Sequence, residues 1–306
     1  KEILKNKIQQ VKIKKPNENY SMNNIIATPD KINEISKECP IPDFNDSDFK
    51  YIRPIGEGSY GMIYLVENIK NNKEYALKKI LCKSLKEILK HKNQLELIYS
   101  MNHENIMKIY NLQFKYLDLT TYSLYVIMER AIGDWSLDIR KRILNKRFYK
   151  ESEIINILKQ VVSALSYMEE NKIAHRDIKP QNILIFPGKI FKVGDLGEAK
   201  KEDNASKEKT LRGSELYMSP LVYQRHKLNK KDVIHNVFKS DWSSDVCSSD
   251  LFSLGYSALY AICLNLNVLE DIRELDSMKN IVNIVDKFFN RSIYSEKLYN
   301  LIFKMI

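Results

Sequence analysis

The stretch AHRDIKPQNILIF, residues 174–186, brings a carboxylate, an ammonium group and a carboxamide into one short segment of the chain. Asp177 could orient an attacking hydroxyl group and accept its proton. Lys179 could neutralise negative charge on a phosphoryl group while that group is transferred. Asn182 offers an amide oxygen, which is a ligand type that hard cations prefer. This combination of side chains predicts a site for phosphoryl transfer.

Glycine-containing motifs stand on both sides of this stretch. In GDLG, residues 194–197, Asp195 could bind Mg²⁺ that bridges phosphate oxygens. Upstream, GEGSYG places Gly56, Gly58 and Gly61 between two apolar runs. Dinucleotide-binding turns use the same spacing but lead into a helix, whereas MIYLVE continues here as a strand. We therefore favour a hairpin whose glycines let the backbone lie over phosphates, with a plain glycine-rich hairpin as the alternative.

Lys78, in YALKKI, stands on the strand expected after this hairpin. A lysine in a strand is usually only solvated, but from this place its ammonium group could reach the α- and β-phosphates of a nucleotide. Each motif alone is common by chance. Their combination, HRDxKxxN followed by DLG and preceded by a glycine-rich hairpin and an AxK frame, is far more specific.

Charge and cysteine content argue against several other classes of protein. The net charge is +10, but the lysines are scattered among acidic residues, which disfavours a nucleic-acid-binding role. The four cysteines form no CxxC pair, which indicates a reduced setting, with the cytoplasm expected and the nucleus as the alternative. The uncharged segment 251–269 contains serine and asparagine, so we interpret it as a buried helix and not as a membrane span.

Hydrophobic patterning divides the chain into regions. Residues 1–48 are basic and contain several prolines, so we expect an extension without fixed structure. Residues 49–130 consist mainly of short apolar runs that predict strands, with one helix at 83–101. Residues 131–306 are mostly helical and include the amphipathic segment 152–171. We expect an α+β fold with a strand-rich first lobe at 49–130 and a helical second lobe at 131–306.

Taken together, GEGSYG, the AxK frame, HRDIKPQN and GDLG resemble the motifs of eukaryotic protein kinases, in the family's order, from about Phe49 to the end. The lysine of HRDIKPQN resembles the Ser/Thr-specific branch. The resemblance implies a two-lobed kinase fold that binds ATP and Mg²⁺ between the lobes and phosphorylates Ser or Thr of a protein substrate. It implies catalytic roles for Asp177, Lys179 and Lys78, and metal binding by Asn182 and Asp195.

The resemblance also implies a nucleotide site along the glycine-rich hairpin, the hinge between the lobes and two apolar walls. Met128 would be the gatekeeper, and Asp134 is a candidate contact for the ribose. For the apolar members, simple core packing is the alternative interpretation. The expected nucleotide-binding set is Ile55, Gly56, Gly58, Gly61, Ile63, Ala76, Lys78, Met128, Glu129, Ala131, Asp134 and Leu184.

Control by a second kinase is a further implication of the resemblance. Thr210 stands where many members of the family carry an activating phosphate, and Arg176 could pair with that phosphate. An unmodified surface threonine is the alternative.

Departures from the family pattern keep a second function open. Gln94 stands where the family has a glutamate, and a glutamine can hydrogen-bond Lys78 but cannot neutralise it. Leu221 replaces the glutamate of the family's A-P-E motif. The chain begins with Lys1 and ends before the family's last helix, so we expect a fragment. The alternative to an active enzyme is a catalytically weak or inactive pseudokinase-like scaffold that binds partners.

The stretch DWSSDVCSSDL, residues 241–251, lacks the Lys, Ile, Asn and Tyr that are abundant elsewhere. One back-translation of it resembles a sequencing-library adapter, so we interpret it as a contaminant, with a real Ser-rich acidic insert as the alternative. The family pattern has a buried helix here that opens with an aspartate. We therefore expect the extra residues to interrupt that helix and loop out, while Asp250 still stands shortly before Gly255.

Overall fold

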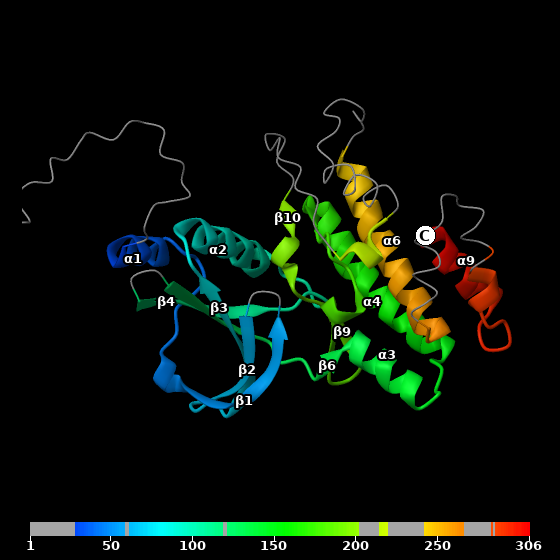
Figure 1. Ribbon diagram of the computed structural model, residues 1–306, viewed down its shortest axis with the longest axis horizontal. Coiled ribbons are helices and arrows are strands. Elements are labelled where there is room, and N and C mark those ends of the chain that lie inside the picture. The colour runs from blue at the N-terminus through cyan, green and yellow to red at the C-terminus, as the bar shows by residue number, and fades with distance from the viewer. Residues whose placement is uncertain are drawn as a thin grey trace, which may run out of the picture.

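An antiparallel sheet of five strands occupies the first half of this computed structural model, which describes residues 28–58, 61–118, 121–201, 214–219, 242–265, 283 and 285–306. The spatial order is β1-β2-β3-β5-β4, so β4 is an edge strand. Two helices, α1 (Pro29–Lys37) and α2 (Leu85–Ser100), lie on one side of the sheet (Figure 1). The strands are β1 (Phe49–Gly58), β2 (Gly61–Asn68), β3 (Lys73–Cys82), β4 (Ile109–Asp118) and β5 (Thr121–Met128).

Strand pairing explains how the sheet presents its polar side chains. β1 and β2 form the predicted hairpin, in which Gly58 pairs with Gly61. β5 lies between β3 and β4, and every residue after Thr121 in it is buried, as its aromatic and branched composition favours. On β3, Lys78 pairs with Ile63 of β2 and with Val126 of β5. The backbone of this lysine is therefore fixed on both sides.

Helix α2 confirms the helical period predicted for residues 83–101. Its N-cap Ser84 accepts a hydrogen bond from the backbone N–H of Glu87 (3.2 Å), which satisfies one of the free donors of the first turn. One face of the helix is buried, because its apolar residues recur at a spacing near one helical turn. The buried residues are Leu85, Ile88, His91, Leu95 and Ile98.

The segment before the sheet is folded, and this corrects the expectation of an extension without fixed structure for residues 28–48. Helix α1 starts at the N-cap Thr28, has a proline in its first turn and buries Ile32 and Ile35 in the main core. A helix this short is marginal alone, so tertiary packing decides whether it forms. Residues 1–27 lie outside the described part of the chain.

After α1 the chain runs along the edge strand β4. The backbone N–H of Leu112 donates to the carbonyl of Pro42 (3.0 Å). The side-chain amide of Asn111 donates to the carbonyls of Pro42 (3.3 Å) and Asp43 (3.2 Å), and that of Gln113 donates to the carbonyl of Phe44 (2.9 Å). The segment then enters β1 through the short helix η2 (Asp46–Asp48).

The second half of the chain is mostly helical. Its helices are α3 (Trp135–Leu144), α4 (Glu151–Glu170), α6 (Trp242–Cys263) and α9 (Glu296–Met305). The short strands are β6 (Gly133–Asp134), β7 (Ile173–Ala174), β8 (Ile183–Phe186), β9 (Ile190–Val193) and β10 (Lys200–Lys201). Single turns of 3-10 helix form η3 (Pro180–Asn182), η4 (Leu196–Glu198) and η5 (Glu215–Tyr217). The predicted segment 152–171 is helix α4, which ends at the C-cap Asn171.

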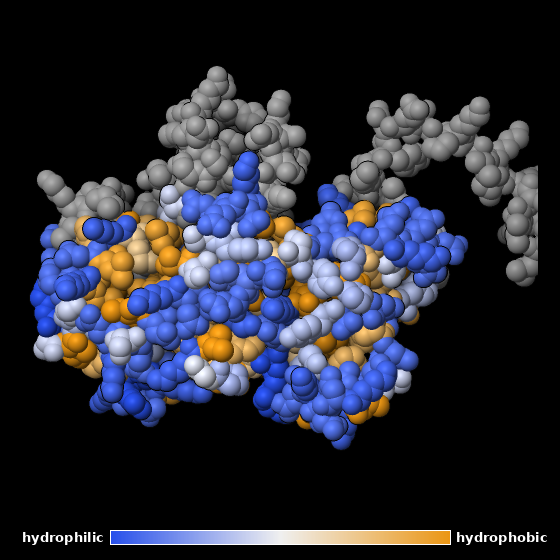
Figure 2. Space-filling view, turned by 180° about the vertical axis from the view of Figure 1, so that it is seen from behind, coloured by the Kyte–Doolittle hydropathy of each residue, from blue (hydrophilic) through white to orange (hydrophobic). Residues whose placement is uncertain are grey.

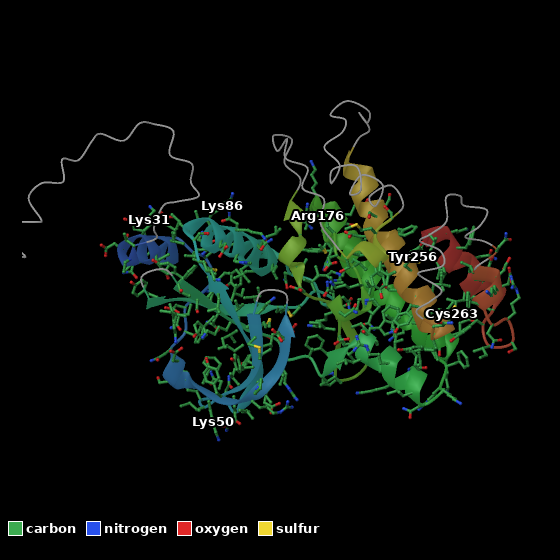
Figure 3. The ribbon with its side chains drawn as sticks, in the orientation of Figure 1. Lys31, Lys50, Lys86, Arg176, Tyr256 and Cys263 are labelled. Atoms are coloured by element: carbon green, nitrogen blue, oxygen red, sulfur yellow. The ribbon has the colours of Figure 1, made fainter. Side chains whose placement is uncertain are left out.

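Helix α6 corrects the expectation that residues 241–251 would interrupt it and loop out. The helix runs without a break from Trp242 to Cys263, and Asp250 lies inside it. Figure 3 labels Tyr256 and Cys263 along this helix. Within the described ranges, no helix combines the length and the apolarity that crossing a membrane requires. Residues 266–269 of the uncharged segment are outside the described part.

The architecture confirms the predicted α+β class, because a sheet-rich half is followed by a helical half (Figure 1). One continuous hydrophobic core extends through both halves, from Ile32 of α1 to Ile302 of α9. On the face turned away from the viewer of Figure 1, hydrophilic residues cover most of the surface, with hydrophobic patches between them (Figure 2). The boundary proposed between the lobes, at residues 130 and 131, stays a prediction.

Candidate active site

The loop after β7 is fixed by a buried carboxylate of α6. Asp250 accepts the backbone N–H groups of His175 (2.7 Å) and Arg176 (2.8 Å). The buried imidazole of His175 accepts the N–H of Asp177 at Nδ1 (3.2 Å), so its Nε2 donates to the carbonyl of Gly194 (3.0 Å). Arg176, labelled in Figure 3, has a left-handed backbone with φ 65°. These contacts fix the main chain on the N-terminal side of Asp177.

The carboxylate of Asp177 is the centre of a hydrogen-bonded group. Its Oδ2 accepts from Lys179 Nζ (2.7 Å) and from Asn182 Nδ2 (3.0 Å), and its Oδ1 accepts the backbone N–H of Ser214 (2.8 Å). Burial acts to raise the pKa of Asp177, but the Lys179 ammonium group and Ser214 outweigh it and hold that pKa below its ordinary value. Asp177 is therefore a carboxylate, and not a carboxylic acid, at neutral pH.

Two oxygen ligands predicted for a metal ion face the same region. The amide nitrogen of Asn182 donates to the carbonyl (2.7 Å) and to the carboxylate of Asp177, which leaves its amide oxygen for a cation. The backbone carbonyl of Asn182 accepts the N–H of Gly194 (2.9 Å), which places Asp195 next to it. No cluster of three or more His, Cys, Asp or Glu that could hold a metal ion exists among the described residues.

Lys78 and Asp195 join the sheet to the second half of the chain. Lys78 Nζ lies 3.2 Å from Asp195 Oδ1, and their side chains are 14% and 29% exposed. Asp195 follows β9 and has a left-handed backbone, with φ 47° and ψ 57°. Such a conformation is costly for a residue other than glycine, and it turns the chain directly into η4.

A cavity of about 650 Å³ lies between the sheet and the helical half. Its wall is mixed, because apolar side chains from both halves line it together with the polar groups just described. Most of the predicted site residues line it. These are Ile55, Gly56, Ile63, Ala76, Lys78, Met128, Glu129, Ala131, Asp134, Lys179, Asn182, Leu184 and Asp195.

Within the described side chains, Asp177 and Gly61 are predicted site residues that do not line the cavity. Asp177 is bonded to Lys179 and Asn182, which do line it. Gly58 and Gly61 form the end of the β1–β2 hairpin. Gly61 has φ 153°, and a Cβ atom there would lie 1.9 Å from the carbonyl oxygen of Lys79, so a side chain at this position would displace the backbone.

The connection between the two halves is held by a buried ion pair. Met128 ends β5, and the backbone N–H of the next residue, Glu129, donates to the carbonyl of Lys108 (3.1 Å). The carboxylate of Glu129 accepts from Lys192 Nζ at 2.7 and 2.9 Å, and also accepts the N–H of Lys108 (3.0 Å). Because Lys192 belongs to β9, this pair ties the connection to the strand that leads to Asp195.

Asp134 has a structural role at the mouth of the cavity. As the N-cap of α3 it accepts the backbone N–H of Leu137 through Oδ1 (2.9 Å). Burial raises the pKa of Asp134 above its ordinary value. A contact with a ribose therefore remains a prediction for this residue, while its role as a helix cap is observed.

Gln94 makes a contact that the sequence did not reveal. Its side-chain nitrogen donates to the backbone carbonyl of Gly197, in η4. Its side-chain oxygen is buried and has no hydrogen-bond partner among the described residues, so the expected bond from Lys78 to this oxygen does not form. The neighbouring carboxylate Glu96 is paired with Lys92 (2.7 Å), one helical turn away. No carboxylate of α2 lines the cavity within the described residues.

Two further residues of the site were not in the predicted set. Ser214, in the segment GSELYMSP, lines the cavity, and its hydroxyl group is 2.7 Å from Lys179 Nζ. His91, on the buried face of α2, lines the cavity as well, and burial together with nearby lysines lowers its pKa. The sequence pointed to Ser214, because GSELYMSP resembles the substrate-binding end of a kinase activation segment, whereas nothing in the sequence singled out His91. Thr210 and Leu221 lie outside the described residues.

Comparison with known proteins agrees with this geometry. The family model described as "Protein kinase domain" matches residues 49–306. Probable serine/threonine-protein kinase nek3 of Dictyostelium discoideum is 32% identical over 271 residues, which are 84% of this chain and 22% of that protein. Serine/threonine-protein kinase Nek4 of Mus musculus is 30% identical over 213 residues, which are 68% of this chain and 25% of that protein. The chain thus spans about a quarter or less of these two relatives.

Proposed function

Because the chain belongs to the protein kinase domain family, we propose that it transfers the γ-phosphoryl group of ATP to Ser or Thr hydroxyl groups of protein substrates. The observation that carries this proposal is the hydrogen-bonded group around Asp177, beside a cavity that Lys78 and Asp195 also line. A carboxylate, two ammonium groups and a carboxamide are the side chains that phosphoryl transfer from a nucleotide to a hydroxyl group requires.

The cavity residues fit ATP and Mg²⁺. The volume of about 650 Å³ is in the range of small-molecule sites, and the wall of Ile63, Ala76 and Leu184 would accept the flat adenine ring. Asn182 and Asp195 would hold Mg²⁺ through an amide and a carboxylate oxygen. Few protein ligands suffice, since Mg²⁺ keeps waters and binds phosphate oxygens. When bound, this ion would neutralise charge on the phosphates.

The reaction would proceed with a simple balance of bonds. The substrate hydroxyl oxygen forms a bond to the γ-phosphorus, the bond from that phosphorus to the β–γ bridging oxygen breaks, and ADP leaves with the electron pair. Asp177 orients the hydroxyl group and accepts its proton, which its lowered pKa allows because the carboxylate is free of protons at neutral pH. Lys179 and Lys78 stabilise negative charge on the phosphate oxygens.

Phosphate transfer to a Ser/Thr peptide library, measured with labelled ATP and Mg²⁺, tests the proposal. We expect transfer by the wild-type chain and none by Asp195→Asn, which loses the carboxylate expected to hold the metal. Asp286→Asn is the matched control, because that aspartate is exposed, pairs with Arg291 (2.8 Å) and does not line the cavity. Undiminished transfer by Asp195→Asn would refute the assignment.

Gln94 favours a second candidate function, a pseudokinase-like scaffold, because a neutral side chain on α2 cannot neutralise Lys78. Stabilisation by ATP and Mg²⁺ without any release of ADP would support the scaffold. Release of ADP that depends on Asp195 would support the enzyme. The protein substrate, an activating kinase acting on Thr210 and a cytoplasmic location stay predictions.

A further inference from the structure

We propose that Gln94 is a positioning residue, whose side-chain amide holds the segment that carries Asp195 by donating to the carbonyl of Gly197. The inference rests on the proposed function, since it concerns how the metal-binding carboxylate of that site is fixed. It assigns an active role to a residue that otherwise looks like the loss of a carboxylate.

The contact from Gln94 lies in the turn that begins at Asp195. Asp195 is the N-cap of η4, and Gly197 lies inside that single turn, so a hydrogen bond to Gly197 restrains the turn that begins at Asp195. Leu196, between them, is buried and lines the cavity together with Gln94. The preceding strand β9 fixes the chain on the other side of Asp195. The segment that carries the Asp195 carboxylate is thus restrained on both sides, by β9 before it and by the contact from Gln94 after it.

The polarity of this contact explains why a glutamine stands at position 94. A backbone carbonyl can only accept, so the side chain that faces Gly197 must donate. Glutamate has the same size and shape as glutamine, but at neutral pH it has only acceptors, and its charge would be repelled by the carbonyl oxygen. The observed partner therefore selects glutamine over glutamate at position 94. Lys78 keeps a negative partner meanwhile, because its Nζ lies 3.2 Å from Asp195.

Nucleotide binding by the full chain tests this role with isosteric variants. Gln94→Glu exchanges the donor for a charged acceptor, and Gln94→Met removes the donor with little change in size. Asn93→Asp is the matched control, since it makes the same amide-to-carboxylate change on an exposed residue of α2 that does not line the cavity. The Kd of ADP is measured for each variant with and without Mg²⁺.

We expect both Gln94 variants to weaken ADP binding in Mg²⁺ by about five- to tenfold, the effect of one hydrogen bond of ordinary net strength. Binding without Mg²⁺ stays within about twofold, because the proposed role acts on the metal-binding carboxylate, and Asn93→Asp behaves as wild type. A purely structural role would instead weaken binding equally with and without Mg²⁺, which would overturn the proposal.

Two further outcomes would also overturn it. Tighter binding by Gln94→Glu would mean that a carboxylate pairing with Lys78 is the better solution for this site. Unchanged binding by Gln94→Met would mean that the donor is not needed. The assay does not require phosphate transfer, so an inactive wild-type chain would contradict the proposed function and would leave this test intact.

Discussion

The ion pair between Lys192 and Glu129 should stabilise the fold, and the effects of mutating its two members should not add. The side chains are only 11% and 16% exposed, and the ammonium group lies 2.7 and 2.9 Å from the two carboxylate oxygens. Lys192→Met leaves the Glu129 carboxylate buried with the Lys108 N–H as its observed donor. We expect a loss of about 3 kcal/mol in the free energy of unfolding, the low end for breaking a buried pair.

The other single variant and the double variant complete the cycle. Glu129→Gln keeps an acceptor for the Lys108 N–H but leaves the ammonium group without a counter-charge, which should cost about 2 kcal/mol. The double variant buries no charge, and Met replaces the lysine stem, so it should cost about 1 kcal/mol. The effects of the two single variants then do not add, and the interaction energy between the two side chains is about 4 kcal/mol.

Urea unfolding followed by circular dichroism measures all four proteins of the cycle. The exposed pair of Arg130 and Glu74, with side chains 34% and 40% exposed, is the control, and Glu74→Gln should change stability by less than about 1 kcal/mol. If the Lys192 and Glu129 effects simply add, the two groups are not coupled and the reasoning from burial is wrong.

Three further predictions follow from local geometry. Gly61→Ala should raise the KM for ATP about tenfold and lower the thermal stability, because a Cβ atom would collide with the Lys79 carbonyl, whereas Gly56→Ala meets no protein atom closer than 4.0 Å and should leave the thermal stability unchanged. Ile35→Ala should lower the free energy of unfolding by about 2–4 kcal/mol in urea titrations, whereas the exposed Lys31→Ala on the same helix should leave it nearly unchanged. Asp177 has a lowered pKa, so its negative charge stabilises the fold above about pH 4. The difference in unfolding free energy between wild type and Asp177→Asn should therefore shrink as the pH falls below that value. A difference that grows on acidification would contradict the lowered pKa.

The sequence motifs predicted most of the residues of the site, because the spacing within a motif is set by local structure. Asp177 and Asn182 are close in the chain, and a tight loop and a single helical turn bring their side chains together. Lys78 and Asp195 are far apart in the chain, and the motif order alone linked them. The period of apolar residues predicted α2 and α4 well, since each buries one face against the core.

Contacts between distant segments explain what the sequence did not reveal. The sequence showed that position 94 lacks a carboxylate, but not that its amide would meet the carbonyl of Gly197, because nothing local connects the two. The prolines around α1 suggested a chain without fixed structure, whereas Ile32 and Ile35 are buried in the main core on a helix that contacts β4. The sequence also did not reveal that α6 continues through Asp250. The unusual composition of residues 241–251 favoured an interruption, although these residues directly precede a segment predicted to be a buried helix.

The segment that runs along β4 has a consequence for solubility and for aggregation. An edge strand offers unpaired N–H and C=O groups to any other extended chain, and proteins avoid such pairing by covering the edge. Here Pro42 accepts the backbone N–H of Leu112, and side-chain amides of β4 hold the carbonyls of Asp43 and Phe44 against the strand. A chain shortened to start at Phe49, where the family match begins, would expose this edge together with the apolar surface under α1. We therefore expect a chain that starts at Phe49 to associate more readily than one that also contains residues 28–48.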